Sequence, residues 1–225
     1  MTRAVILLAG MGSRLGRPHP KALTPLAEGG ETIFARQLRM LQSFDLDVWA
    51  VVGFKMDLIM EAAPGLMFAY NPDFDCTNTS KSLLAALRHV RDEDVLWLNG
   101  DVVFEPEIIQ RVLACGESAV AVDNAKVAEE EVKYSLNERG YIREISKKVA
   151  APLGEALGIN LVTARHLAAF RDKLAAVDDS DYFERGMELL IAEQGDVFRP
   201  VDVGDLRCVE VDFAADLDRA RTLFK

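Results

Sequence analysis

The most constraining feature of this sequence is the regular alternation of short apolar runs with amphipathic segments over residues 1–123. The first run, AVILLA at residues 4–9, is apolar at every position, as is typical of a strand buried on both faces of a parallel sheet. Further strands are expected at 47–54, 66–71, 94–101 and 118–123, and helices at 31–44, 56–63, 77–90 and 106–116. This alternation predicts an α/β fold, in which right-handed crossover helices flank a mostly parallel sheet.

The pattern changes in the second half of the chain. Residues 131–148 contain two strand-like runs joined at NERG, which predicts an antiparallel hairpin extension of the sheet. The other elements expected there are strands at 156–163, 197–203 and 207–212 and helices at 164–177, 182–194 and 216–224. Because no Gly/Ser-rich linker separates the two parts, we expect a single domain over residues 1–225.

Composition narrows the possible partners. The chain of 225 residues has a formal net charge of -10, which argues against a general nucleic-acid binder, because such proteins present a basic surface. Its three cysteines, Cys76, Cys115 and Cys208, form no CxxC pair, so we expect free thiols in a reducing cytosol. No apolar run reaches the length of a membrane span, and AVILLA is too short for a signal peptide. We therefore expect a cytoplasmic protein that binds neither nucleic acid nor membranes.

The connection after the first strand, LLAGMGSRLGRPHPKALTPL at residues 7–26, is long and rich in glycine and basic residues. From Gly10 its glycines have the spacing GxGxxxG, which differs by one residue from the dinucleotide fingerprint GxGxxG. Pro18 and Pro20 also prevent an early helix, and the GK[ST] of a Walker A loop is absent. Neither of these known phosphate loops therefore accounts for the segment.

A third interpretation is a loop that wraps a nucleotide. Glycines let main-chain amides approach phosphate closely and adopt positive φ, and Arg14 and Lys21 would neutralise a triphosphate. The structural alternative is a Gly/Pro-rich connection with solvated basic side chains. A loop of this length after a first strand is usually functional, so the nucleotide interpretation is preferred.

The motif LLAGMGSRLG, followed by PKAL, resembles the signature LAxGxGxRLxxxxPKxL of the nucleotidyltransferase superfamily, with Leu8 where that signature often has alanine. The resemblance fits a Rossmann-like sheet, with residues 1–123 as the nucleotide-binding half and 124–225 as the acceptor-binding half. It implies that Arg14 faces the β- and γ-phosphates and that Lys21 stabilises charge at the α-phosphorus. The residues that it assigns to nucleotide binding in this loop are Leu8, Ala9, Gly10, Met11, Gly12 and Ser13.

Two acidic segments are similar to the metal-site segments of this superfamily. LNGD ends at Asp101, after an expected central strand, and VEVDFAADLDRA places Glu210 and Asp212 at the end of another strand. Carboxylates of this kind suit Mg²⁺, which nucleotidyl transfer uses to neutralise the triphosphate. The alternatives are a turn or N-cap role for Asp101 and a surface position for Glu210. Together with the loop, the segments favour a Mg²⁺ site formed by Asp101, Asp212 and Glu210.

One further stretch indicates which group within the superfamily this chain resembles. YNPDFDCTNTSKSLLAAL resembles the corresponding stretch of the phosphocholine cytidylyltransferase-like group, which also includes enzymes acting on 2-aminoethylphosphonate. It makes Asn71, Thr77, Asn78 and Ser82 candidates for base, ribose or acceptor contacts. Turn and helix-cap chemistry is the alternative for all four. We favour a nucleotide-binding role for Asn78 and Ser82 only.

Candidates for the acceptor pocket come from the second half. YIREISKK resembles a lysine-bearing stretch of the same group, so Lys147, or else Lys148, is expected to hold the acceptor phosphate as a catalytic residue. GEALGINLVT is similar to another stretch of the group, which makes Glu155 an acceptor-binding candidate. A cationic acceptor would also need aromatic faces and a carboxylate. Residues available for this purpose include Asp123, Tyr134, Tyr141, Tyr182, Phe183 and Glu184, of which Asp123 and Tyr182 are the preferred acceptor-binding candidates.

The sequence thus predicts a Mg²⁺-dependent cytidylyltransferase that moves CMP from CTP to a small amine-bearing phosphate or phosphonate and releases pyrophosphate. No Ser-His or Cys-His signature is present, as expected for a transfer that needs no protein nucleophile. The alternatives are a sugar-1-phosphate uridylyl- or guanylyltransferase and a catalytically silent nucleotide-binding module. We expect a monomer or a homodimer.

Overall fold

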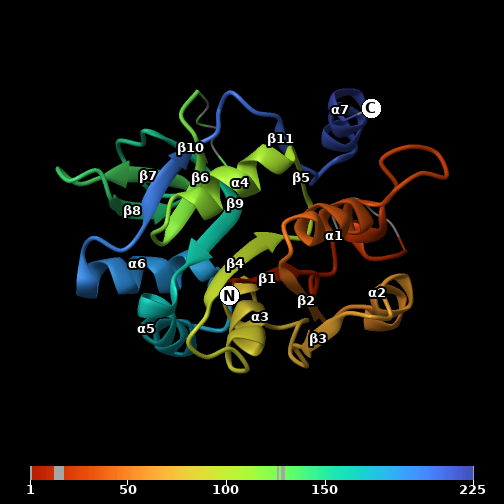
Figure 1. Cartoon of the computed structure of the whole chain (residues 1–225), viewed down its shortest axis with the longest axis horizontal. Helices are drawn as coiled ribbons and strands as arrows, with labels where there is room; N and C mark the ends of the chain where they lie inside the picture. The colour runs from red at the N-terminus through yellow and green to blue at the C-terminus, as the bar shows by residue number, and fades with distance from the viewer. Residues whose placement is uncertain (1, 13–17, 126, 128–129, 225) are drawn as a thin grey trace.

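In the computed structural model, which describes residues 2–12, 18–125, 127 and 130–224, a mixed sheet runs through the centre of the molecule (Figure 1). Its strands are β1 (Thr2–Leu7), β2 (Asp47–Val52), β3 (Met67–Tyr70), β4 (Asp94–Asn99), β6 (Ala119–Asp123), β7 (Lys133–Leu136), β8 (Ile142–Ser146), β9 (Gly154–Val162) and β10 (Arg199–Asp202). The order across the sheet is β10-β6-β9-β4-β1-β2-β3, and β7 and β8 form a hairpin beside β9. The predicted Rossmann-like α/β fold, with its antiparallel hairpin extension, is confirmed.

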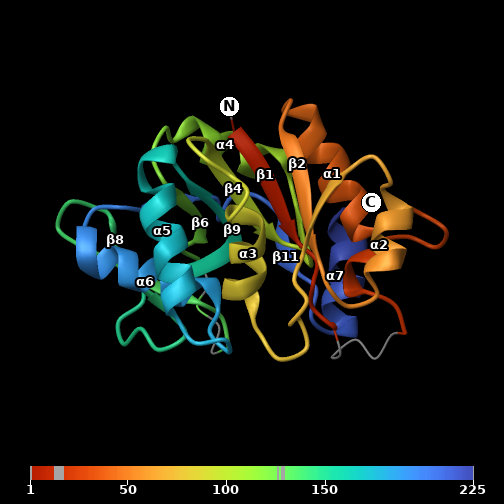
Figure 2. The ribbon, with the colours of Figure 1, turned by 90° about the horizontal axis from the view of Figure 1, so that it is seen from below.

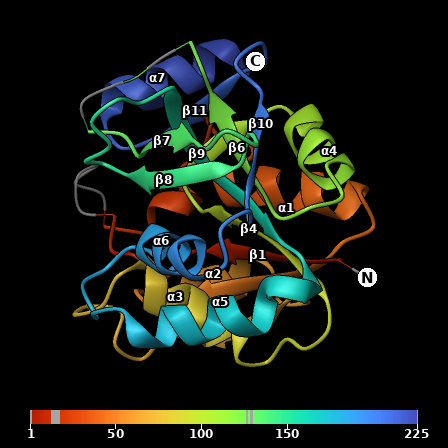
Figure 3. The same ribbon diagram turned by 90° about the vertical axis from the view of Figure 1, so that its left-hand side faces the viewer.

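The strand β1 lies between β2 and β4 and pairs in parallel with both (Figure 2). Helices cover both faces of the sheet, as Figure 3 shows for α5 on one side and α4 on the other. The helices are α1 (Ile33–Ser43), α2 (Met56–Ala62), α3 (Thr79–Leu87), α4 (Pro106–Ala114), α5 (Ala164–Ala176), α6 (Phe183–Gln194) and α7 (Ala214–Leu223). Val5 and Leu7 belong to the core that includes α3, α5 and α6, whereas Ala4 and Ile6 belong to the core under α1, α2 and α4. Burial on both faces explains why β1 is apolar throughout.

Local capping explains where two of the helices begin. Thr32 is extended, and its side-chain oxygen accepts a hydrogen bond from the Ala35 amide at 3.1 Å, so it caps α1. Pro106 is the first residue of α4, where its missing amide proton removes no intrahelical hydrogen bond.

Two pairings were not predicted. The strand β9 comes from the second half of the chain, yet it lies between β4 and β6 and is antiparallel to both. The short strand β5 (Val102–Phe104) pairs antiparallel with β11 (Cys208–Glu210) as a separate small sheet. An apolar run does not reveal its direction, and a strand of three residues is too short to show a period.

The aromatic core joins the sheet to the helices of the second half. The Trp97 ring on β4 stacks on Phe170 of α5, with centroids 5.3 Å apart, and meets Phe183 of α6 edge-on at 5.6 Å. These buried contacts fix the first turn of α6, which carries residues of the site described below. Within the described ranges, no helix combines the length and the apolar character needed to span a membrane.

Candidate functional site

A cavity of about 740 Å³ opens at the carboxyl ends of β1 and β4, where parallel sheets usually bind ligands. Ala9 and Gly10 follow β1 into its wall, and Asn99, Gly100 and Asp101 form the wall after β4. A second, smaller cavity of about 160 Å³ shares Gly10 and Asp101 and adds residues of the glycine loop. The predicted loop and the predicted metal segment therefore meet at one edge of the sheet.

The main chain of the turn after β4 is fixed by close contacts with β1 and with the Gln37 side chain. A Cβ atom on Gly100 would lie 2.5 Å from the Leu7 carbonyl oxygen, so only glycine lets the end of β4 pass this close to β1. The buried Gln37 side chain donates to the carbonyl oxygens of Asn99, at 2.9 Å, and Val102, at 2.8 Å. Asp101 lies between these two anchors, and its position at the cavity follows from them.

The pairing of β5 with β11 brings the other two predicted metal ligands to Asp101. Glu210 lies opposite Val102 in this pair, and the Val211 amide donates to the Asp101 carbonyl oxygen at 3.0 Å. As a result Asp101, Glu210 and Asp212 each offer a carboxylate oxygen within 4.8 Å of the others. Two segments that are distant in sequence thus converge on one carboxylate cluster.

Lys21 lies inside this cluster. Its Nζ atom is 2.5 Å from Asp101 Oδ2 and 2.7 Å from Asp212 Oδ1. Burial lowers the pKa of Lys21, but the charges and hydrogen bonds of Asp101 and Asp212 raise it more, so that the net shift is upward. Lys21 is therefore an ammonium ion at any physiological pH.

Glu210 shows that the cluster favours positive charge. Burial, followed by the charges of Asp101, Glu131 and Asp212, raises the pKa of Glu210 to about 8. In addition, Asp101 Oδ1 is buried and has no hydrogen-bond partner among the described residues. An orphaned carboxylate oxygen beside two further carboxylates fits a hard divalent cation such as Mg²⁺.

The glycine loop lies against this cluster. Leu8, Gly10 and Gly12 line the smaller cavity together with Lys21. Gly12 has φ +57°, and a Cβ atom there would be 2.8 Å from the Lys21 Cβ atom, so the loop crosses directly over the lysine. The Met11 side chain is largely exposed, and the predicted residues Ser13 and Arg14 lie outside the described residues.

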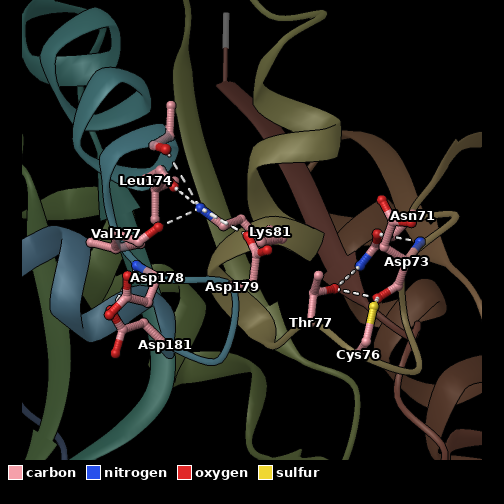
Figure 4. A network of polar contacts seen from close by, with 11 residues as sticks. Asn71, Asp73, Cys76, Thr77, Lys81, Leu174, Val177, Asp178, Asp179 and Asp181 are labelled. Carbon is pink, nitrogen blue, oxygen red and sulfur yellow. Dashed lines mark hydrogen bonds and ion pairs between the residues drawn. The ribbon is translucent and has the colours of Figure 1, made fainter.

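Asn78 and Ser82 line the large cavity but also have structural partners. Asn78 Oδ1 accepts from the Thr79 amide at 2.8 Å and caps α3, and its Nδ2 donates to the Ser180 carbonyl oxygen. The side-chain Nδ2 of Asn71 donates to Thr77 Oγ1 at 3.0 Å (Figure 4) and to Ser82 Oγ at 3.1 Å. The capping alternative is therefore realised for Asn78, and nucleotide binding by both residues stays a prediction.

The acceptor candidates separate into two groups. Lys147 and Tyr182 both line the large cavity, and Lys147 Nζ lies 5.7 Å from the centre of the Tyr182 ring. Glu155 and Asp123 face each other in the β6–β9 pair and do not belong to the cavity wall. The buried Asp123 Oδ1 accepts from the Ala125 amide at 2.8 Å, which gives it a local structural role.

Sequence reasoning missed much of the acidic wall. The acidic residues that line the large cavity are Asp101, Glu130, Glu131, Glu184, Glu210, Asp212 and Asp216, and its one basic lining residue within the described part of the chain is Lys147. Burial and the charge of Glu155 raise the pKa of Glu131, although Lys147 lowers it. No spacing in the sequence predicts that residues 130–131, 184 and 216 meet, because only the folded hairpin and helices bring them together.

The fold and this arrangement of loop, lysine and carboxylates are those of a nucleotidyltransferase. The chain belongs to the family of the MobA-like NTP transferase domain, whose model matches residues 4–195.

Individual relatives support this assignment. The chain is 33% identical to the CMP-5'-(3-aminopropyl)phosphonate synthase of Streptomyces rubellomurinus over 97% of its own length. It is 31% identical to the bifunctional protein GlmU of Methanococcus maripaludis over 72% of its length. It spans only 38% of each of these two curated relatives. Among solved structures, the CTP:phosphocholine cytidylyltransferase of Streptococcus pneumoniae has a TM-score of 0.75 at 17% identity, covering 100% of this chain and 99% of that one, which is a likeness of fold.

Proposed function

We propose that this nucleotidyltransferase moves CMP from CTP to a small amine-bearing phosphonate or phosphate and releases pyrophosphate. The observation that carries the proposal is the Lys21 ammonium, which lies between Asp101 and Asp212 directly under the glycine loop. The similarity to a relative named for CMP-5'-(3-aminopropyl)phosphonate synthesis supports both the choice of nucleotide and the choice of acceptor.

In the proposed reaction, an oxygen of the acceptor attacks the α-phosphorus of CTP and forms a new P–O bond. The bond from the α-phosphorus to the bridging oxygen breaks, and its electron pair leaves with pyrophosphate. Lys21 stabilises the negative charge that spreads over the α-phosphoryl oxygens, and loop amides from Gly10 onward position the phosphates. Arg14 is proposed to contact the β- and γ-phosphates.

Asp101, Glu210 and Asp212 would hold Mg²⁺ through carboxylate oxygens. When bound there, the ion supplies positive charge to the triphosphate. The buried Asp101 Oδ1, which has no partner among the described residues, is the atom that gains most from such an ion. Lys147 is proposed to hold the acceptor's phosphonate, because it is the basic side chain that lines the acceptor end of the cavity in the described chain.

The test is pyrophosphate release with CTP, UTP, GTP and ATP in the presence of Mg²⁺. Each nucleotide is paired with 3-aminopropylphosphonate, 2-aminoethylphosphonate, phosphocholine, a polyol phosphate and glucose-1-phosphate. Release with CTP and an amine-bearing acceptor supports the proposal and identifies the acceptor. Release only with UTP or GTP and glucose-1-phosphate contradicts it in favour of sugar-nucleotide synthesis. Binding of CTP without release from any pair contradicts it in favour of a silent nucleotide-binding module.

A further inference from the structure

Glu184, in the first turn of α6, is a partly buried residue whose carboxylate the reaction above does not use. It lines the large cavity, and its Oε2 atom has neither exposed surface nor a hydrogen-bond partner among the described residues. Burying an unpaired carboxylate oxygen is costly unless a partner arrives. A group of opposite charge that enters the cavity would be such a partner.

The neighbours of Glu184 also favour a cation. Tyr182, two residues earlier, lines the same cavity, and its side chain is half exposed. Aromatic faces attract ammonium groups, and Lys147 Nζ already lies 5.7 Å from the centre of this ring. The charge of Lys147 lowers the pKa of Glu184, but Oε2 of Glu184 has no hydrogen-bond partner within the described part of the chain, so this oxygen is left for another cation.

The carboxylate cluster at Lys21 consists of Asp101, Glu210 and Asp212, and Glu184 is not part of it. Burial raises the pKa of Glu184 to about 7, and the side-chain charges that act on it are those of Lys147 and Glu188. The charges acting on Glu210 are instead those of Asp101, Glu131, Asp212 and Lys21. The metal proposed above would be held by Asp101, Glu210 and Asp212, which leaves Glu184 available to the acceptor.

The charges of the residues that line the cavity indicate which charges the acceptor should carry. A phosphonate that carried only negative charge would be repelled by the cavity, because the carboxylates that line it outnumber Lys147. A zwitterion, with an ammonium at one end and a phosphonate at the other, offers Glu184 its missing partner and Lys147 an anion. Glu184 and Lys147 line the same cavity, so one small molecule with its two charged groups joined by a short alkyl chain could contact both.

We propose that Glu184, together with the ring of Tyr182, binds the ammonium group of a zwitterionic aminoalkylphosphonate or aminoalkylphosphate acceptor while Lys147 holds its anionic end. This inference rests on the proposed function and assigns its acceptor specificity to Glu184. The carboxylate acts on the amine and not on the reacting phosphorus. Its loss therefore affects only acceptors that carry an amine.

The test compares 3-aminopropylphosphonate with propylphosphonate, which lacks the amine, as acceptors for the wild-type chain and for Glu184→Gln. We expect the wild type to prefer the amine. In Glu184→Gln we expect kcat/KM for 3-aminopropylphosphonate to fall by about 10- to 100-fold, as for loss of a hydrogen bond to a charged group. The KM for CTP and kcat/KM for propylphosphonate stay unchanged. The matched control is Glu193→Gln, which removes a carboxylate of the same helix that pairs with Lys173 on the surface.

An equal loss with both acceptors, or a wild type without preference for the amine, overturns the inference. Calorimetric binding of the same two phosphonates to the wild-type protein separates this result from failure of the proposed function. If no nucleotide releases pyrophosphate but the amine binds more tightly, and Glu184→Gln removes the difference, the proposed reaction fails and the ammonium site stands. If both phosphonates bind equally or not at all, the ammonium site is refuted whatever the reaction is.

Discussion

The Nζ atom of Lys21 lies 2.5 Å from Asp101 Oδ2, although 79 residues separate them and neither belongs to a strand of the central sheet. One residue follows the glycine loop and the other follows β4, so their contact joins the proposed nucleotide site to the proposed metal site. From this geometry we expect Lys21 to be the position of the proposed reaction that is most sensitive to substitution.

Replacing Lys21 by Met is expected to lower kcat by about 100- to 1,000-fold, because a preorganised charge beside the reacting phosphate is lost. Pyrophosphate release with saturating CTP and acceptor measures the effect. The control is Lys148→Met, whose side chain is exposed and does not line the cavity. Unchanged turnover in Lys21→Met would contradict the assigned role.

The raised pKa of Glu210 predicts how stability depends on pH when divalent cations are removed. With a folded pKa of about 8 against a model value of 4.5, the native state binds more protons than the unfolded state between these values. The free energy of unfolding therefore falls as pH rises through this window. Glu184, with a pKa of about 7, also makes the free energy of unfolding fall as pH rises, up to neutral pH.

Glu210→Gln should reduce this pH dependence, as measured by melting temperature in a chelator from pH 5 to pH 8.5. Because the ion competes with the proton, Mg²⁺ should raise the wild-type melting temperature more at pH 8 than at pH 6. Glu107→Gln on the exposed side of α4 is the control and should follow the wild type. A Mg²⁺ effect in Glu210→Gln equal to that of the wild type would exclude Glu210 as a ligand.

Gln37→Met is expected to reduce the free energy of unfolding by about 1–3 kcal/mol, since two buried carbonyl oxygens would lose their donor. These oxygens flank Asp101, so the variant should also bind Mg²⁺ more weakly. Urea denaturation and a Mg²⁺ titration followed by melting temperature measure the two effects. Gln42→Met, an exposed position on the same helix, should change neither. A destabilised variant with unaltered Mg²⁺ affinity would show that the turn does not depend on Gln37.

Lys81→Met should raise the KM for the acceptor more than the KM for CTP. The Lys81 ammonium donates to the Val177 carbonyl oxygen at 2.6 Å and to that of Leu174 at 3.2 Å, which ties α3 to the end of α5 (Figure 4). Without this tie, the segment that leads to Tyr182 loses an anchor. Steady-state kinetics with each substrate varied separately gives the two constants.

The control for Lys81→Met is Lys173→Met, which removes only an ion pair with Glu193 on the surface. Both variants are compared at a temperature well below their melting transitions. Equal rises in the two KM values of Lys81→Met would indicate a general loss of structure and not a displaced acceptor wall.

Much of the nucleotide end of the site was predictable because each of its parts lies at a strand end. The apolar runs before Gly10 and before Asp101 predict parallel strands, whose carboxyl ends meet at one edge of the sheet. The position of Asp212 depends instead on the antiparallel pairing of β11 with β5, which was not predicted. The structure places Lys21 beside Asp101 and Asp212, in the same cluster as Glu210, and the roles of these residues stay predictions.

The acceptor end was less predictable for a physical reason. Glu131 lies before a hairpin strand and Glu184 in the first turn of a helix, and their positions depend on how those elements pack. Asp123 and Glu155 looked equally suitable in the sequence, but the strand pairing places them beside each other outside the cavity wall. Local patterns do not encode which face of a distant element a side chain reaches.

The position of β9 also governs the order in which this chain can be assembled. β4 and β6 are consecutive in sequence among the strands of the central sheet, but each pairs with β9 and not with the other. A nascent chain that has not yet reached residue 154 therefore has open edges on both strands, which are sites for wrong pairing. The same interleaving means that a chimera cannot exchange residues 124–225 as a unit, because the exchanged piece contains a strand from the middle of the recipient's sheet.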